Sequence, residues 1–299
     1  RADIVINEIM YHPADDAGGE YIELLNRSGE EVNLSGWAFT RGIDFEFPNG
    51  TAIGPGEYLV LAREPQLTQE HYDIEGVLGP WEGSLSNSAE TLLLRDQNGN
   101  PADRVRYADE GSYPETPDGE GPSLELINPG IENRYGPAWR ASEEQGTPGR
   151  FNSRSQADPD PIIAGIRHHP VTPTADESVR VLASVSDDRE LSGVTLTWEV
   201  DGDNDSRETI EMVDDGEGDD GVEGNGIYGA EIPAQSDLDI VAFWINAQAE
   251  GDQSTRAPAD APERPCLYQV ENTPPEEPRP LYRIIMRRSG LQNFRNRAR

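Results

Sequence analysis

The feature that most constrains the fold is a series of short stretches in which successive side chains alternate between two faces. Each stretch is bounded by turn-forming residues. In Glu20–Asn26, the side chains of Tyr21, Glu23 and Leu25 share one face, which is the pattern of a half-buried strand. The break before it, His12–Gly19, contains a proline and paired glycines, and these residues favour loops. Runs of this kind predict β-strands joined by turns.

Asp158–Pro161 alternates Asp with Pro and predicts a domain boundary, because proline interrupts both helices and strands. Before it, Thr91–Arg95 and Asp103–Tyr107 flank an Asn-Gly turn and predict a hairpin, whereas residues 64–88 are interpreted as an irregular excursion. After it we predict a second series of strands, none with helical period: Ile162–His168, Ser178–Val185, Val194–Val200, Thr209–Val213, Ile227–Ile232 and Asp239–Ala247. The sequence therefore predicts an all-β chain of two tandem β-sandwiches.

Acidic residues strongly outnumber basic ones, with 57 Asp and Glu against 24 basic residues, all of which are Arg. The formal charge of −33 repels nucleic acid and anionic lipid, and no apolar run approaches the ~20 residues of a membrane helix. We therefore expect neither nucleic-acid binding nor membrane insertion. The charge has two interpretations: a calcium- or salt-exposed extracellular surface, or the acidified proteome of a salt-loving or GC-rich organism.

The best candidate for a ligand site is acidic. Asp201–Asp205 carries an aspartate at every second position, and residues 214–226 hold six acids among five glycines. Calcium takes six to eight oxygen ligands, and glycine lets a loop curl so that oxygens converge. The first stretch opens like an EF-hand loop, but Ser206 and Met212 stand where that loop needs Gly and Glu. We predict calcium as a stabilising ion; the alternative is two solvated acidic hairpin loops. The predicted metal ligands are Asp201, Asp203, Asp205, Asp214, Asp215, Asp219 and Asp220.

Catalytic motifs are missing from the sequence, which has no Gly-x-Ser-x-Gly, HExxH, P-loop or Rossmann fingerprint. Glu8 and Glu23 are a pair of carboxylates of the kind that glycosidases use; the alternative is that they are structural or rim groups of two strands. The single cysteine, Cys266, has no partner for an internal disulfide. We predict no catalytic residues, no cofactor-binding residues and no enzymatic activity within this chain.

The N-terminal half also resembles the lamin tail domain, a family of immunoglobulin-like β-sandwiches. The resemblance covers residues 1–153 and rests on these segments, in order: Ile6–Ile9, Glu20–Asn26, Leu34–Trp37, Pro55–Leu61, Gly146–Gly149 and Asn152. It implies that residues 1–154 form one immunoglobulin-like domain. It implies little about function, because function depends on the sites that a fold carries.

Residues 155–272 resemble the immunoglobulin- or fibronectin-like modules of bacterial surface proteins, on the segments Met212–Gly216 and Gly226–Pro233. In multidomain bacterial proteins such a module often stands between a lamin tail domain and a kinase domain like that of the spore-coat protein CotH. Pro280–Met286 resembles the opening strand of that kinase domain. Residues 273–299 hold seven Arg and two Glu and are interpreted as a basic tail or a truncated domain start; the alternative is a segment that docks on an acidic surface.

These observations predict a non-catalytic protein that is extracellular or at the cell surface, with a structural or adhesion role and calcium as its stabilising ion. The expected partners are proteins or glycans at the cell surface and further copies of the chain. There are two alternatives. In one, the chain is the accessory region of a CotH-type kinase whose activity lies outside residues 1–299. In the other, it is a subunit of an extracellular fibre that assembles by addition of edge strands.

Overall fold

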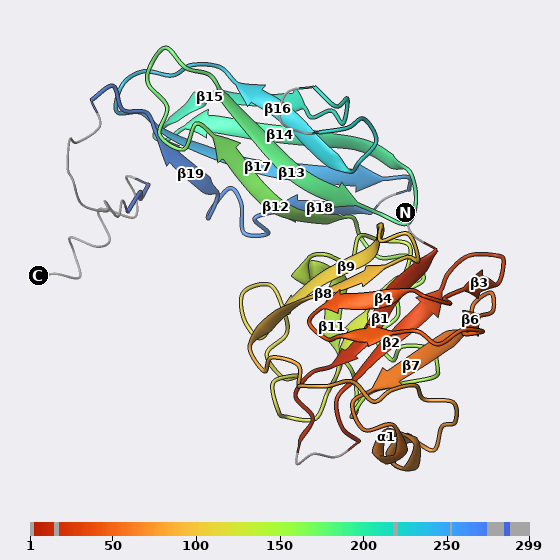
Figure 1. Ribbon diagram of the computed structural model, residues 1–299. Coiled ribbons are helices and arrows are strands. Elements are labelled where there is room, and N and C mark those ends of the chain that lie inside the picture. Colours follow the sequence, from red (N-terminus) through yellow and green to blue (C-terminus); the bar gives the residue numbers. More distant parts are fainter. Residues whose placement is uncertain (1–2, 15–17, 218–220, 252, 274–283, 288–299) are drawn as a thin grey trace, which may run out of the picture. The chain divides into compact units, whose positions relative to one another are not determined.

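The computed structural model describes residues 3–14, 18–217, 221–251, 253–273 and 284–287. The chain divides into two compact units with the boundary between Pro159 and Asp160, called unit 1 and unit 2 below. Both are built from sheets with antiparallel strand pairs (Figure 1), which confirms the predicted all-β fold class. None of the helices in the described ranges is both long and apolar enough to span a membrane.

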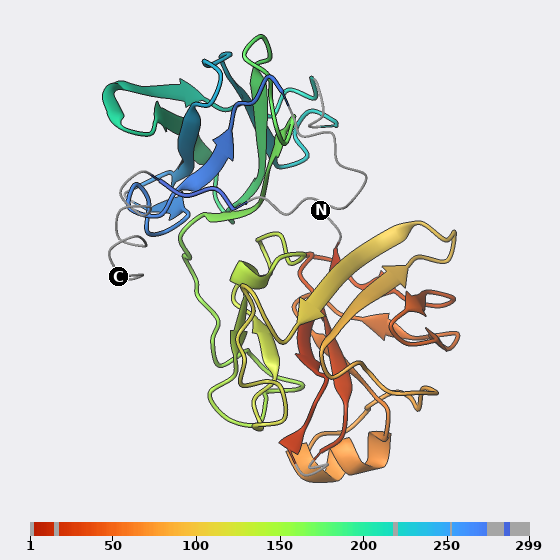
Figure 2. The same cartoon turned by 90° about the vertical axis from the view of Figure 1, so that its left-hand side faces the viewer.

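Unit 1 is a β-sandwich whose two main sheets form separate layers, as Figures 1 and 2 show from two directions. One sheet has the strand order β11-β10-β1-β2-β7, the other has the order β5-β4-β8-β9, and β3 pairs with β6. The strands are β1 (Ile4–Met10), β2 (Tyr21–Asn26), β3 (Val32–Asn33), β4 (Ala38–Arg41), β5 (Phe45–Glu46), β6 (Ala52–Ile53), β7 (Tyr58–Ala62), β8 (Ala89–Arg95), β9 (Pro101–Ala108), β10 (Leu124–Leu126) and β11 (Trp139–Ala141).

The centre of unit 1 is the pair β1 and β2, in which every residue is buried. The prediction that β2 is half-buried is therefore wrong. Alternation along β2 places apolar residues on one face, and the opposite face, with Tyr21 and Glu23, is covered by chain from far along the sequence. A period of two reports which side chains share a face, but it cannot report what later covers that face.

Residues 64–88 contain a helix, α1 (Pro65–Tyr72), where an irregular excursion was predicted. Pro65 begins the helix, at a position where the missing N–H is not needed. Thr68 is the buried residue of the helix, and its hydroxyl donates a hydrogen bond to the carbonyl of Gly18 at 2.6 Å. The helix buries so little apolar surface that apolar residues do not recur every 3.6 positions in its sequence.

Unit 2 is a second sandwich, with one sheet in the order β12-β13-β16 and another in the order β15-β14-β17-β18, where β19 also pairs with β17. As predicted, Val179, Val181, Ala183 and Val185 share one face of β13 and lie in the core. The strands are β12 (Ile162–His169), β13 (Val179–Ser186), β14 (Leu191–Val200), β15 (Asp203–Glu211), β16 (Ile227–Ile232), β17 (Ile240–Ala249), β18 (Ser254–Ala257) and β19 (Cys266–Gln269).

The hairpin of β14 and β15 differs from the sequence prediction. β14 ends at Val200 and β15 begins at Asp203, so only Asp201 and Gly202 form the turn. Asp203 and Asp205 are strand residues and not members of an open loop. The strand extends so far because Val200 pairs directly with Asp203, and a two-residue connection with glycine suits a tight hairpin.

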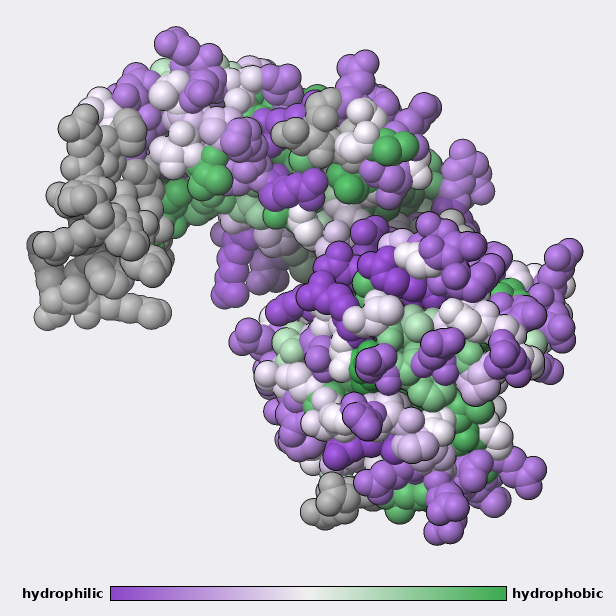
Figure 3. All heavy atoms as spheres, viewed as in Figure 1, coloured by the Kyte–Doolittle hydropathy of each residue, from purple (hydrophilic) through white to green (hydrophobic). Residues whose placement is uncertain are grey.

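Hydrophilic residues cover most of the surface seen in Figure 3, and apolar residues appear there only in small scattered patches.

Candidate functional site

Three glutamates lie side by side in the centre of unit 1. Glu8 on β1 is the direct cross-strand neighbour of both Glu23 on β2 and Glu125 on β10, so the three side chains point to one face. All three are 0 % exposed. Like charges directly opposite each other destabilise a sheet, and this arrangement, called the glutamate row below, therefore needs a specific compensation.

The compensation comes from residues 146–154, called the closing segment below. The backbone N–H of Thr147 donates to Glu8 Oε1 at 2.8 Å, that of Gly149 to Glu23 Oε2 at 2.5 Å, and that of Arg154 to Glu125 Oε2 at 2.7 Å. Each glutamate therefore accepts a main-chain hydrogen bond from this one segment. The row fixes the path of a segment more than a hundred residues away from Glu8 in sequence.

Side chains complete the contacts of Glu8. Its Oε1 accepts hydrogen bonds from the hydroxyls of Tyr21 at 2.6 Å and Ser123 at 2.5 Å. The hydroxyl of Thr147 lies 2.7 Å from Glu125 Oε1 and 3.3 Å from Glu8 Oε2. The Thr147 hydroxyl is thus a donor within reach of both carboxyl groups, and the shorter contact is the one to Glu125.

A pair of asparagines ties the row to the closing segment. Asn7 Nδ2 donates to Glu23 Oε1 and to Asn152 Oδ1, both at 2.8 Å. Asn152 Nδ2 donates in turn to the carbonyls of Asn7 at 3.1 Å and Leu126 at 2.9 Å. Both amides are buried, so their full hydrogen bonding is a condition for stability.

Gly146 closes the site from outside. Its φ is +118°, and a Cβ at this position would lie 2.1 Å from the Tyr21 hydroxyl and 2.8 Å from Glu8 Oε1. The backbone therefore passes so close to the row that only glycine fits. A cavity of about 600 Å³, lined in part by Gly146 and Tyr72, lies next to this residue, but the carboxyls themselves are sealed from solvent.

The electrostatics of the row favour protonation. Burial raises the pKa of Glu8 from 4.5 to about 7, against the hydrogen bonds from Ser123, Tyr21 and Thr147. Burial, and next the charge of Glu8, raise the pKa of Glu23 well above its usual range. Among the described residues no ion pair involves either group or Glu125. Glu8 and Glu23 therefore retain a proton between them near neutral pH, because two buried neighbouring carboxyl groups resist ionising together.

Of the two roles considered for Glu8 and Glu23, the geometry favours the structural one. A glycosidase needs its carboxyls around a space that a sugar and a water molecule can enter, and these carboxyls are fully enclosed by hydroxyl, amide and main-chain donors. What this arrangement can do chemically is retain a proton and hold the closing segment.

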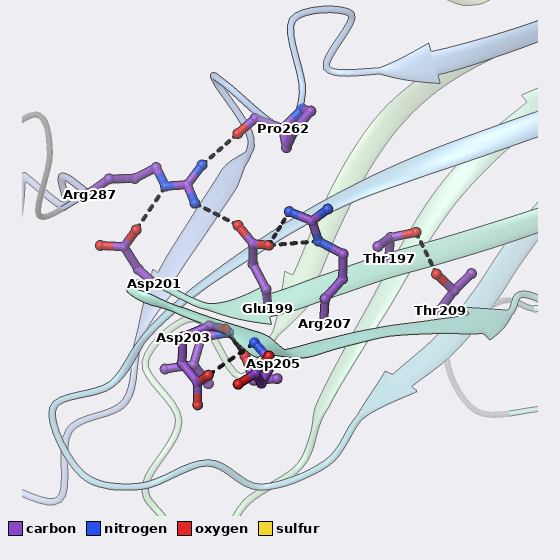
Figure 4. A network of polar contacts seen from close by, with 11 residues as sticks. Thr197, Glu199, Asp201, Asp203, Asp205, Arg207, Thr209, Pro262 and Arg287 are labelled. Carbon is purple, nitrogen blue, oxygen red and sulfur yellow. Dashed lines mark hydrogen bonds and ion pairs between the residues drawn. The ribbon is translucent and has the colours of Figure 1, made fainter.

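In unit 2, the predicted metal ligand Asp201 lies in a different arrangement (Figure 4). Arg287 Nε donates to Asp201 Oδ1 at 2.8 Å and Arg287 Nη2 to Glu199 Oε1 at 2.6 Å. The other oxygen of Glu199 accepts from Arg207 Nε at 2.8 Å and Nη2 at 2.6 Å. Arg287 also donates to the carbonyl of Pro262 at 2.5 Å. Asp201 is thus held in an ion pair with a residue of the basic C-terminal region.

The remaining predicted ligands do not meet at one point within the described residues. Asp203 and Asp205 are exposed on β15, where Asp203 Oδ1 accepts the N–H of Asp205 at 3.1 Å. Asp214 accepts the N–H groups of Gly224, Asn225 and Gly226 at 3.0, 3.2 and 2.8 Å. Its carboxylate thereby closes the acidic loop on itself.

Asp215 accepts the N–H of Glu217 at 3.0 Å, while Asp219 and Asp220 lie outside the described residues. Across the part of the chain that is described, no group of three or more His, Cys, Asp or Glu side chains is arranged to hold a metal ion. Calcium binding by the loop that contains Asp219 and Asp220 stays a prediction.

Sequence reasoning missed the partners of both sites. Glu125 is the central residue of β10, and a charged residue flanked by Leu on both sides is a usable signal of a buried carboxyl. Gly146 and Thr147 were noted as parts of a motif, without a role. Nothing in the sequence pairs Arg287 with Glu199, because their separation along the chain is too large for a local pattern to connect them.

The fold and the glutamate row define unit 1 as an immunoglobulin-like β-sandwich closed by a C-terminal segment. Residues 1–109 match the family model of the Lamin Tail Domain, which supports the resemblance stated for the N-terminal region. The match ends just after β9, so β10, β11 and the closing segment follow it. No curated protein matches the chain. The resemblances of residues 155–272 and of Pro280–Met286 stay predictions, and residues 280–283 lie outside the described part.

Proposed function

We propose that this chain is a non-catalytic structural protein of the cell surface that acts in adhesion or assembly. The observation that carries the proposal is how the two units use their buried acids. In unit 1 the glutamate row holds the closing segment, and in unit 2 Glu199 holds Arg207 and Arg287. These acids join segments of the chain that are distant in sequence, which suits a module that spaces or connects other proteins.

The acid-rich surface supports a location outside the cytoplasm. Single-sign charge keeps a protein soluble and apart from anionic lipids, and carboxylates in glycine-rich loops are suitable ligands for the millimolar calcium found outside cells. In this proposal calcium binds the loop of residues 214–226 and makes unit 2 more rigid. Its partners are proteins or glycans of the cell surface.

Protease treatment of intact cells that produce the protein tests this proposal. We expect the chain to be cleaved from intact cells while a cytoplasmic marker stays whole. Beads coated with the purified chain should then bind to the same cells, and the binding should weaken when calcium is chelated. Detection of the chain only after lysis, or beads that do not bind in either condition, would contradict the proposal.

Assembly into a fibre is a second candidate, and the sheet order favours it. β12 is an outer strand of the sheet β12-β13-β16, and an outer strand offers unpaired main-chain groups to a further strand. The other outer strand, β16, is partly covered, because Gly229 exchanges main-chain hydrogen bonds of 2.8 and 3.0 Å with Val213. Exposed Arg167 and His169 on β12 act against pairing. Size-exclusion chromatography with light scattering decides between these outcomes: concentration-dependent growth supports a fibre, and a strict monomer at high concentration excludes it.

A further inference from the structure

A pocket in unit 1 has the opposite charge to the rest of the chain. Its volume is about 530 Å³, and five arginines and two acids, Asp103 and Glu132, line it, which gives a formal balance of +3 in a chain of net charge −33. The arginines are Arg27, Arg41, Arg95, Arg104 and Arg134. So many cations in one small hollow are not explained by composition, because acids outnumber arginines more than twofold along the chain.

The sheet itself brings two of these arginines together. Arg41 on β4 and Arg104 on β9 are each the direct cross-strand neighbour of Leu93 on β8. The three side chains therefore share one face. Leu93 is only 7 % exposed, as expected when the aliphatic stems of flanking arginines lie over it. All three residues line the pocket, so an apolar residue lies between two cationic ones on its wall.

Three of the pocket arginines are not neutralised by acids in the part of the chain that is described. Arg95 donates to the carbonyl of Gly99 at 2.6 Å and to the hydroxyl of Thr40 at 3.2 Å. Within the described residues, no ion pair involves Arg41, Arg95 or Arg104. Like charges gathered on one sheet face destabilise it, and a bound anion would remove this repulsion.

The two acids of the pocket are already occupied. Asp103 Oδ2 accepts the N–H of Ile6 at 2.7 Å and Asn133 Nδ2 at 2.8 Å. Glu132 receives two hydrogen bonds from the guanidinium of Arg134, both at 3.0 Å. These acids anchor the walls of the pocket, and Arg41, Arg95 and Arg104 are left to face a ligand.

We propose that this arginine pocket binds a compact polyanion, a small molecule with two or more phosphate, sulfate or carboxylate groups. Guanidinium forks bind such groups through paired hydrogen bonds. A volume of about 530 Å³ lies within the range of small-molecule sites. The surrounding charge disfavours extended polyanions such as nucleic acid, since most of their length would lie over acidic surface. This inference is independent of the proposed function.

Titration calorimetry of the full chain with three probes tests the proposal and identifies the source of the anion. The probes are inorganic tripolyphosphate, sucrose octasulfate and citrate, each without divalent metal. We expect at least one to bind with one-to-one stoichiometry and a Kd below about 1 mM. The probe that binds most tightly assigns the anion to a phosphate, a sulfated sugar or a carboxylate.

Matched charge-neutralising variants locate the binding. Arg104→Gln and Arg41→Gln should each weaken binding by about tenfold or more, because each removes a charge-assisted hydrogen bond. The control is Arg106→Gln, an exposed arginine on the same strand, β9, that does not line the pocket. It should change the Kd by less than about twofold at physiological salt.

A spectroscopic readout keeps the test independent of variant stability. In NMR spectra of the Arg Nε–Hε groups, the binding probe should shift the signals of the pocket arginines and leave that of Arg106 in place. Absence of binding by all three probes overturns the proposal. So does an equal loss of affinity in Arg106→Gln and Arg104→Gln, or a uniform shift of all arginine signals.

Discussion

In unit 1 the buried carboxyls of the glutamate row meet hydroxyl, amide and main-chain N–H groups, whereas in unit 2 the buried carboxylate of Glu199 meets the guanidinium groups of Arg207 and Arg287. Both units place glutamates on central strands, where a charge without compensation is costly. Unit 1 compensates by protonation and by a segment that brings neutral donors. Unit 2 compensates with opposite charge. The comparison shows that a buried acid is informative only together with the partner that satisfies it.

The largest effect is expected from the residue that allows the closing segment to reach the row. Gly146→Ala should destabilise unit 1 by about 3 kcal/mol or more, because the new Cβ would lie 2.1 Å from the Tyr21 hydroxyl at a φ of +118°. Hydrogen exchange of the β1 amides measures the loss. Gly29→Ala is the control, since nothing lies within 4 Å of its Cβ. Equal effects of the two changes would refute the close packing described for Gly146.

The pH dependence of unit 1 is the next largest effect. Glu8 has a pKa of about 7 in the folded state, raised from 4.5. The stability it contributes is therefore fully present below pH 4.5 and is lost as pH rises through about 7. Glu8→Gln keeps the neutral form at all pH values. Relative to the unmodified chain, this variant should gain on the order of 3 kcal/mol of unfolding free energy between pH 5 and pH 8.

Urea denaturation at pH 5, 6, 7 and 8 provides the measurement. The exposed Glu31→Gln should follow the unmodified chain within about 0.5 kcal/mol at each pH. If Glu8→Gln instead lost stability relative to the unmodified chain as the pH rose, the row would be ionised, and its difference from the arginine-paired acids of unit 2 would disappear.

Removal of an arginine tests the other side of the comparison. Arg287→Gln should destabilise unit 2 by roughly 1–2 kcal/mol, because Glu199 and Asp201 are nearly buried while Arg287 is partly exposed. Arg264→Gln removes an exposed pair with Asp260 and should cost less than about 0.5 kcal/mol. Urea denaturation measures both. An Arg287 variant as stable as the Arg264 variant would show that the contact of Arg287 is incidental.

Calcium would be a third way to neutralise acids, and its expected effect is the smallest. At ten times its Kd, calcium should stabilise unit 2 by about 1.4 kcal/mol, seen as a rise in melting temperature. Simultaneous change of Asp219 and Asp220 to Asn should abolish this rise, whereas Asp203→Asn on β15 should preserve it. No heat in calorimetry and no rise in melting temperature at millimolar calcium would reject the ion.

The sequence predicted the strands well where local pattern decides them. Val179–Ser186 alternates, and its apolar face lies in the core of unit 2. The hairpin around Asn98-Gly99 forms as β8 and β9, with Gly99 at a φ of +82°. The alternation in β2 predicted a half-buried strand, but β2 is buried on both faces. The closing segment, which is distant in sequence, covers its second face. The sequence pattern also gave no sign of α1, because the helix buries too little surface for apolar residues to recur with a helical period.

The candidate sites also depend on contacts between distant residues, which local sequence patterns do not reveal. Asp201 was singled out by its acidic neighbours in sequence, but its ion-pair partner is Arg287. Glu8 and Glu23 were noted as a pair, but the third member of the row, Glu125, and the donors of the closing segment come from distant positions. The arginine pocket was not predicted at all, because its residues are dispersed among acids from Arg27 to Arg134.

By itself the sequence determined that this chain forms β-strands with turns between them, that it carries a large negative charge, and that its N-terminal part resembles the lamin tail domain. These properties depend on neighbouring residues or on sums over the chain. Only the tertiary structure decided which acids are buried with a raised pKa, which are paired with arginine and where cations gather in a pocket. Those outcomes depend on burial and on contacts between residues far apart in sequence, because burial changes the free energy of a charge and distant segments supply its partners.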